Sequence, residues 1–213
     1  MAIGLLLGAA ALVLAGYNVW EDHQAGENAN LALELVTDEI PESIAALEDQ
    51  LDSASSMSEV EYPDFVLNPK MDMPVKEMKG QDYLGVIEIP SLEMELPIIS
   101  EWSDARLKVA PCRYMGSVYT GDMIISGHSY KNHFRHIRKL EPGDRVIFTD
   151  MDGNRFVYEV TGTEVIAETD VEQMEDGEWD LTLFTCTPNG SSRHTVRCAL
   201  MEDENPWMKY IDE

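Results

Sequence analysis

The chain has 213 residues, enough for one domain with a sizeable core and additional segments. It holds 40 acidic and 15 basic residues, which gives a formal net charge of −25 at pH 7. No Lys or Arg precedes Lys70, while thirteen acidic residues lie between Glu21 and Asp64. This distribution argues against a nucleic-acid partner, because a phosphate backbone would be repelled along that whole third.

The N-terminal residues 3–20 are apolar, and Asn18 is their only clearly polar side chain. A membrane-spanning helix needs about 20 apolar residues, with about 17 at the short end. Tyr17 and Trp20 lie where an interfacial aromatic belt would place them. A cleaved signal peptide is the alternative, but its cationic first region is missing. We therefore expect residues 1–20 to form an uncleaved transmembrane anchor, with the acidic stretch that follows outside the membrane.

Residues 21–82 are predicted to form an acidic helical stalk and linker. Apolar residues recur at three- and four-residue spacing from residue 25 to about residue 51, which is typical of a helix. Pro41 either kinks this helix or begins a second one. Residues 62–82 contain three prolines and are expected to be extended and irregular. The whole segment is interpreted as a solvated stalk that lifts a domain off the membrane.

From residue 83 onward the hydrophobic pattern becomes that of β-strands, and the sequence Asp152-Gly153-Asn154 is a hairpin signal between two apolar runs. Helical stretches are short, at residues 103–109 and 131–140. We predict an all-β fold over residues 83–213, a closed eight-stranded barrel followed by a short acidic tail. The expected strands lie at residues 84–89, 96–99, 122–126, 145–149, 156–160, 163–168, 181–186 and 193–200.

The three cysteines do not form an even disulfide framework. Cys112 and Cys198 are interpreted as buried and inert, with a bridge between them as the alternative. Cys186 ends an apolar β-like run and precedes a polar turn, which places its thiol at the lip of a strand. An unpaired thiol at such a position is a candidate nucleophile.

Two arginines, Arg193 and Arg197, follow Cys186. If residues 181–186 and 193–200 form a hairpin, Arg193 faces Cys186 with Cβ atoms about 4.5–5.5 Å apart. Arg197 would then be a rim charge roughly 13 Å further along the strand. His128 follows Gly127 at the end of an expected strand. Together these groups suit acyl transfer, because a thiolate attacks a carbonyl, an imidazolium protonates the leaving amine and a guanidinium stabilises the oxyanion.

The remaining histidines are weaker candidates for this chemistry. His133 and His136 have the spacing of a metal-binding pair, but no carboxylate or thiol cluster completes a site, so a solvated polar helix face is expected. Strand alternation points His194 away from the face that carries Arg193. No metal site is therefore expected, and acyl transfer by Cys186, His128 and Arg193 requires no cofactor. The stretch after His128 is locally basic, with Lys131, Arg135, Arg138, Lys139 and Arg145.

The stretch Thr182-Leu183-Phe184-Thr185-Cys186, with Arg193 downstream, resembles the signature of the sortases, cysteine transpeptidases of Gram-positive cell surfaces. The resemblance extends over about residues 83–200. Residues 83–90 are similar to the opening strand of that family. The histidine motif and the pattern that follows it are matched by Ile124-Ile125-Ser126-Gly127-His128, Phe134, Leu140 and Gly143-Asp144.

This resemblance implies an eight-stranded sortase barrel in which Cys186 is the nucleophile, His128 the acid and Arg193 the oxyanion-stabilising group. Thr185 and the backbone N–H of Thr187 are candidates for secondary contacts with the substrate. The implied partners are surface proteins with a C-terminal sorting signal of the Leu-Pro-x-Thr-Gly type, and an amine acceptor from a peptidoglycan precursor or a pilin. The implied location is the cell membrane, with one span and an extracellular catalytic domain.

A papain-like hydrolase and a non-catalytic surface binding domain are the two alternative functions, and the sortase subclass stays open. A papain-like hydrolase would carry its cysteine on a helix, whereas Cys186 ends a β-like run. A non-catalytic surface binding domain would not need all of Cys186, His128 and Arg193. The N-terminus is similar to the class B type, but residues 169–180 leave no room for its long helix. No membrane segment follows Leu200, which counts against the typical pilus-polymerising type.

Overall fold

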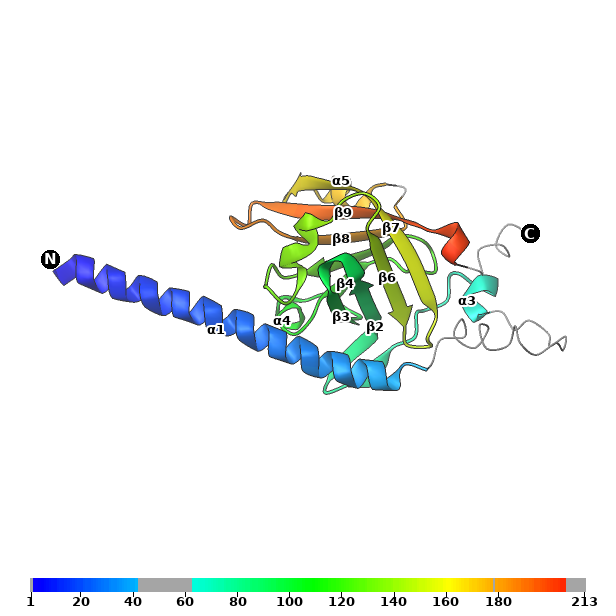
Figure 1. The fold of residues 1–213 in the computed structure, drawn as a ribbon, viewed down its shortest axis with the longest axis horizontal. Coiled ribbons are helices and arrows are strands. Elements are labelled where there is room, and N and C mark those ends of the chain that lie inside the picture. Colours follow the sequence, from blue (N-terminus) through cyan, green and yellow to red (C-terminus); the bar gives the residue numbers. More distant parts are fainter. Residues whose placement is uncertain (1, 42–62, 178, 206–213) are drawn as a thin grey trace.

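The computed structural model describes residues 2–41, 63–177 and 179–205. Within these residues nine strands form one sheet with the order β1-β2-β3-β4-β5-β8-β9-β7-β6. A further pairing of β2 with β6 closes the last eight strands into a barrel, which confirms the predicted fold (Figure 1). The strands are β1 (Lys76–Met78), β2 (Gln81–Ile89), β3 (Met94–Ile99), β4 (Cys112–Met115), β5 (Met123–Gly127), β6 (Arg145–Asp150), β7 (Arg155–Ala167), β8 (Leu181–Cys186) and β9 (Ser192–Leu200).

The helices are short, apart from the first one. Two short helices lie near the places predicted for them, at 104–107 and 134–139, and η2 (Phe134–Lys139) is a 3-10 helix. The other described helices are α1 (Ala2–Glu39), α3 (Asp64–Leu67), α4 (Asp104–Leu107), α5 (Val171–Glu175), η1 (Pro90–Leu92) and η3 (Glu202–Glu204).

The eight barrel strands are not all those expected from the sequence. The predicted strands at 156–160 and 163–168 are one long strand, β7, with a register shift between Val160 and Gly162. The missing eighth strand is β4, which lies between β3 and β5. Its four residues, Cys-Arg-Tyr-Met, are too few and too polar to show the alternation of a strand.

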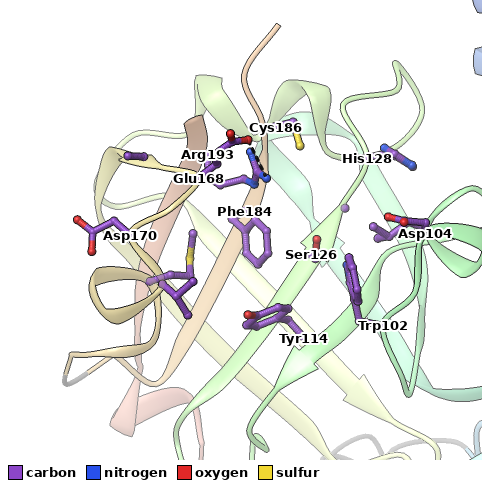
Figure 2. A pocket seen from close by; sticks show the side chains of 15 residues that line it. Trp102, Asp104, Tyr114, Ser126, His128, Glu168, Asp170, Phe184, Cys186 and Arg193 are labelled. Atoms are coloured by element: carbon purple, nitrogen blue, oxygen red, sulfur yellow. Dashed lines mark ion pairs between the residues drawn. The ribbon is translucent and has the colours of Figure 1, made fainter. Parts of the chain in front are cut away.

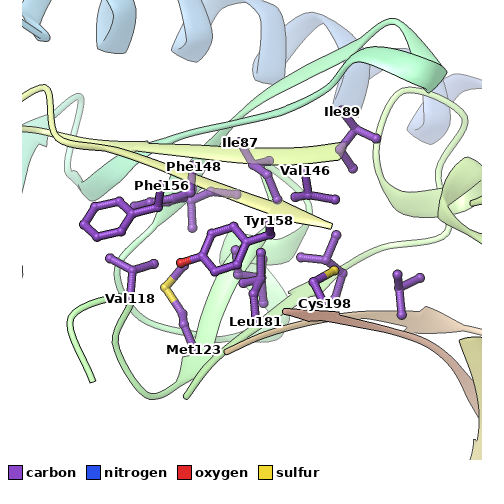
Figure 3. Close-up of a cluster of buried hydrophobic side chains, with 14 of the residues drawn as sticks. Ile87, Ile89, Val118, Met123, Val146, Phe148, Phe156, Tyr158, Leu181 and Cys198 are labelled. Atoms are coloured by element: carbon purple, nitrogen blue, oxygen red, sulfur yellow. The ribbon is translucent and has the colours of Figure 1, made fainter. Parts of the chain in front are cut away.

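The barrel interior is filled by apolar side chains from strands on all sides (Figure 3). Tyr158, Phe148 and Phe156 are fully buried there, and Cys198 lies among them. Cys112 belongs to a separate buried cluster, so both thiols are free and no bridge joins them. Burial raises the pKa of Cys112 to about 12, which keeps this thiol protonated and inert, as expected.

Helix α1 packs on the barrel only through its C-terminal half, while its first part projects away (Figure 1). Ala25, Ala29, Ala32 and Val36 recur at helical spacing and are buried. The expectation of a solvated stalk is therefore wrong for this part of residues 21–82, because a stripe of small side chains lets the helix approach the sheet closely.

The neighbouring segments also bear on the predicted stalk. Phe65 of α3 stacks on Tyr119 with ring centroids 4.6 Å apart, so the part of the linker after residue 62 packs on the barrel as well. Helix α1 ends at Glu39, and the predicted continuation to residue 51 lies outside the described residues. Among the helices that the structure describes, none is long and apolar enough to cross a membrane.

Candidate active site

The β8–β9 hairpin places Cys186 directly opposite Arg193, which confirms the predicted register. The connecting turn is held by two backbone bonds, because the Thr187 N–H donates to the Ser192 carbonyl at 3.0 Å and the Gly190 N–H to the Thr187 carbonyl at 2.8 Å. The cysteine is half-buried at the last position of its strand. The hairpin therefore presents a thiol and a guanidinium together at one end of the barrel.

Strand β5 brings His128 to the same end. It runs parallel to β8 with Gly127 beside Thr185, so His128 leaves the sheet next to Cys186. Gly127 cannot carry a side chain, since a Cβ atom there would lie 2.5 Å from the ring of Phe134. The chain turns back directly after the histidine, where the Phe134 N–H donates to the His128 carbonyl at 3.1 Å.

Cys186, His128 and Arg193 line one cavity of about 220 Å³, which we call the apolar cavity (Figure 2). Three aromatic rings form part of its surface. The ring of Tyr114 lies between the other two and makes edge contacts with Phe184, at a centroid distance of 5.6 Å, and with Trp102, at 6.4 Å. The other residues around it come from α4, β5, the end of β7, the segment that follows β7, and α5. The remaining lining residues are Asp104, Leu107, Ser126, Gly127, Ala167, Glu168, Asp170, Val171 and Met174.

The Arg193 guanidinium is fixed from two sides. Its Nη1 donates to the carbonyls of Gly190 and Ser192 at 3.0 and 3.2 Å, and its Nη2 lies 3.8 Å from a carboxylate oxygen of Glu168. Glu168 is absent from the prediction, since it lies in a separate loop. Only the pairing of β7 with β9, which sets Ala167 beside Ser192, brings it to the site.

Arg197 has a different environment from the one expected. It is buried, and its guanidinium bonds to Glu164 at 2.7 Å, to Thr182 Oγ1 at 2.9 Å and to the carbonyls of Met174 and Gln173 at 3.1 and 2.7 Å. The expectation of a distant rim charge is therefore wrong. The Arg197 side chain therefore links α5 to the sheet formed by β7, β9 and β8. It does not line the apolar cavity.

The His128 imidazole is partly enclosed beside the ring of Tyr130, with ring centroids 4.7 Å apart. Burial lowers the pKa of His128, the charges of Glu21 and Asp104 raise it, and Lys108 lowers it. Burial is the largest of these effects. The neutral imidazole is thus favoured, and acid catalysis by this group depends on a minority protonated form.

Helix α1 holds the loop that follows His128. The Lys131 N–H donates to Asp22 Oδ1 at 2.7 Å, and Asp22 also lies 3.7 Å from the Arg135 guanidinium. Next to these contacts the helix passes so close to Asn132 that a side chain on Gly26 would collide with it. The helix is therefore a structural neighbour of the site, a role that the sequence analysis did not include.

His133 also contacts this helix, which corrects the expectation of a solvated polar face. Its side chain is fully buried, and its Nε2 lies 3.3 Å from the Ala25 carbonyl oxygen. Burial lowers the pKa of His133 to about 4, so the ring is neutral near pH 7. Within residues 2–41, 63–177 and 179–205, no group of three or more His, Cys, Asp or Glu side chains is arranged to hold a metal ion.

A second cavity of about 550 Å³ lies on the other side of Cys186, and we call it the basic cavity. Thr185 and Thr187 line it rather than the apolar cavity. The Thr187 N–H donates to the Ser192 carbonyl, so a substrate contact through this group would have to replace that bond, and the contact stays a prediction. The other lining residues are Ser129, Arg135, Arg138, Cys186, Pro188 and His194.

Comparison with known proteins identifies the class to which this barrel belongs. The family model described as the Sortase domain matches residues 87–201, more than half of the chain. The chain therefore belongs to the sortase family, whose members are cysteine transpeptidases.

Two curated relatives and two solved structures show how far the similarity extends. Sortase A of Bacillus anthracis is 28% identical over 152 residues, which are 65% of this chain and 67% of that protein. Sortase D of Bacillus subtilis (strain 168) is 29% identical over 109 residues, which are 49% of this chain and 54% of that protein, so the match spans about half of its length.

The solved structures are related in fold. A Clostridium perfringens Sortase D5 transpeptidase has a TM-score of 0.56 at 20% identity, covering 82% of this chain and 99% of that one. Sortase C1 of Streptococcus agalactiae has a TM-score of 0.50 at 24% identity, covering 59% and 69%. Both support the same barrel architecture.

Proposed function

We propose that this protein is a sortase that cleaves a Leu-Pro-x-Thr-Gly-like sorting signal through a Cys186 thioester and transfers the shortened protein to an amine. The observation that carries the proposal is the apolar cavity, because Cys186 and Arg193 of the β8–β9 hairpin line it together with His128, which follows β5. Three groups with complementary roles in acyl transfer meet there at one place.

The proposed reaction has two halves. The Cys186 thiolate attacks the threonine carbonyl, and the Arg193 guanidinium stabilises the oxyanion that forms. His128 gives its proton to the leaving glycine amine as the C–N bond breaks, which leaves a thioester and a neutral imidazole. The incoming amine then attacks the thioester carbonyl, His128 accepts the proton from its nitrogen, and the C–S bond breaks to restore Cys186.

The shape and lining of the apolar cavity support its use for the sorting signal. Trp102, Tyr114 and Phe184 give it an aromatic floor and wall, and Val171 and Met174 of α5 also line it. Leucine and proline side chains are apolar, so this surface gains burial when such a peptide binds. Cys186 at the upper edge would then reach a carbonyl further along the peptide (Figure 2).

The proposed partners are surface proteins with a C-terminal sorting signal and an amine of a peptidoglycan precursor or a pilin. We also propose that residues 1–20 anchor the protein in the cell membrane by a single span, with the catalytic domain of residues 83–213 outside and residues 21–82 between them. This part of the proposal rests on the apolar composition of residues 3–20 and on the family.

A product analysis tests the function. The full chain is incubated with a peptide carrying the signal, with and without an added amine, and the products are identified by mass spectrometry. We expect cleavage after threonine and, with the amine, a new amide at that carbonyl. If the peptide is cleaved but none of the added amines forms an amide, the protein is a hydrolase and not a transpeptidase. If no peptide of a library of sorting signals is cleaved, the proposal is contradicted.

A further inference from the structure

Cys186 separates two cavities of opposite character. The apolar cavity has a large aromatic surface formed by Trp102, Tyr114 and Phe184, and its charged lining includes the carboxylates of Asp104, Glu168 and Asp170. The basic cavity carries the guanidinium groups of Arg135 and Arg138 instead, together with Thr185 and His194. Since the thiol borders both, a group bound in either one can reach an acyl group on Cys186.

Two buried polar atoms at the basic cavity lack a partner. Thr185 Oγ1 and His194 Nε2 make no hydrogen bond within the described part of the chain, although Thr185 is only 3% exposed. Buried polar atoms in native proteins are almost always paired. Both residues line this cavity, so a polar ligand there would supply the missing partners.

The charge of the cavity selects the kind of ligand. Arg135 is partly neutralised, because its Nε donates to the Ser129 carbonyl at 2.8 Å and its Nη2 lies 3.7 Å from Asp22. Arg138 has no acidic partner within the residues that the structure describes, and its side chain is exposed. An unpaired guanidinium in a chain of net charge −25 offers a local site for an anion.

We propose that the basic cavity is the acceptor site, and that it takes an amine that bears a carboxylate within a few bonds of its nitrogen. This inference rests on the proposed transpeptidation. The carboxylate pairs with Arg138, and the amine points at the thioester on Cys186. Its nitrogen bonds to the acyl carbon as the C–S bond breaks, and its proton passes to His128.

The cationic lining also suits the chemistry of this step. Only the neutral form of an amine is a nucleophile, and its own carboxylate favours the protonated form. Pairing the carboxylate with Arg138 removes that effect, and the positive wall further disfavours an ammonium ion. A bound acceptor of this class is thus both oriented and activated for attack.

The test compares two acceptors that differ only in the carboxylate, glycylglycine and glycylglycinamide. Transfer from the sorting-signal peptide is measured with each one, and hydroxylamine, a small neutral nucleophile, reports thioester formation in the same preparation. The measured quantity is the ratio of kcat/KM for glycylglycine to kcat/KM for glycylglycinamide. We expect this ratio to exceed one in the unaltered chain.

Arg138→Gln should lower the ratio roughly three- to fivefold, the size expected for one partly exposed ion pair. Lys139→Gln removes the same charge one residue away, outside the cavity lining, and should leave the ratio unchanged. Thr185→Val, which keeps the shape but removes the hydroxyl, should raise KM for glycylglycine.

Equal ratios in Arg138→Gln and Lys139→Gln, or a ratio of one in the unaltered chain, would overturn the acceptor site. An effect of Arg138→Gln on KM for the donor peptide alone would overturn it too, because the cavity would then hold the sorting signal. If hydroxylamine traps no product in the unaltered chain, the proposed function itself fails, which is a different result from each of these.

Discussion

Cys186 and Arg193 occupy directly opposed positions on β8 and β9, the last pair before the turn. This register decides which arginine meets the thiol, because a slip by one residue would turn Arg193 to the other face of the sheet. The guanidinium is kept near its place by the Gly190 and Ser192 carbonyls and by Glu168. Contacts within the chain therefore set the placement of Arg193 beside Cys186.

Replacing the thiol tests the nucleophile. Cys186→Ala should abolish thioester formation and leave the fold intact, because the half-buried side chain at a strand end contributes little packing. Intact-mass analysis after incubation with the peptide measures the acyl adduct. Cys112→Ala is the matched control and should still form it, since that thiol lies buried in a separate cluster. An adduct on the Cys186→Ala chain would contradict the assignment.

Replacing Arg193 tests the oxyanion role. Both Arg193→Ala and Arg193→Lys should lose about 10²–10³ in the rate of acylation, the usual effect of one missing oxyanion donor. Lysine is expected to be poor because a single ammonium cannot reproduce the planar fork. Single-turnover acylation with the sorting-signal peptide measures the effect. A fully active Arg193→Lys chain would show that only a positive charge is needed there.

Arg197→Lys should act on stability instead. The guanidinium makes four hydrogen bonds below the surface, and lysine cannot replace them all, so the free energy of unfolding should fall by about 1–3 kcal/mol. Urea unfolding measures this change. Acylation per folded molecule should stay near that of the unaltered chain, and a selective loss of acylation without loss of stability would refute this structural role.

The sequence predicted the barrel, and it predicted that Cys186, Arg193 and His128 lie near one another, because the signals for both are local. A short polar loop between two apolar runs sets Cys186 opposite Arg193 in any simple hairpin, and Gly127 marks the strand end before His128. The strand β4 was missed because its pairing depends on β3 and β5 rather than on its own residues.

Long-range packing accounts for the other differences. Glu168 reaches Arg193 only through the pairing of β7 with β9, and nothing in its own neighbourhood marks it. The stripe that includes Ala25 and Ala29 has too little apolar surface to signal burial, yet small side chains suit close contact between a helix and a sheet. The acidic composition of the C-terminal half of α1 therefore indicated a solvated helix, although one face of it is buried against the barrel.

The pH dependence of kcat/KM should depend on the charge of Glu21 as well as on the protonation of His128. We expect a bell-shaped profile of kcat/KM, because the reaction needs a thiolate and an imidazolium together. The charge of Glu21 raises the pKa of His128 against the larger effect of burial. Glu21→Gln should therefore lower that pKa, move the limb that His128 controls to lower pH, and reduce the height of the profile.

A control and an opposing variant sharpen this test. Lys108 lowers the pKa of His128, so Lys108→Met should move the same limb to higher pH. Glu27→Gln removes an acidic group of the same helix that is not among the charges acting on the pKa of His128, and it should leave the profile unchanged. If the Glu21 and Lys108 variants shift the limb in the same direction, the electrostatic account of His128 is wrong.

The docking of α1 should control the order of the loop after His128. Ala29 is buried between the helix and the barrel, so Ala29→Leu should push the helix outward and weaken the bond from the Lys131 N–H to Asp22. We expect faster amide hydrogen exchange over residues 129–135 and a lower kcat/KM, because the segment that carries His128 loses its support.

Asn30→Leu places the same side chain on the exposed face of the helix and should change neither quantity. Exchange measured by mass spectrometry on both variants decides the matter: equal protection of the loop in the two chains would mean that the helix packs beside the site without holding it.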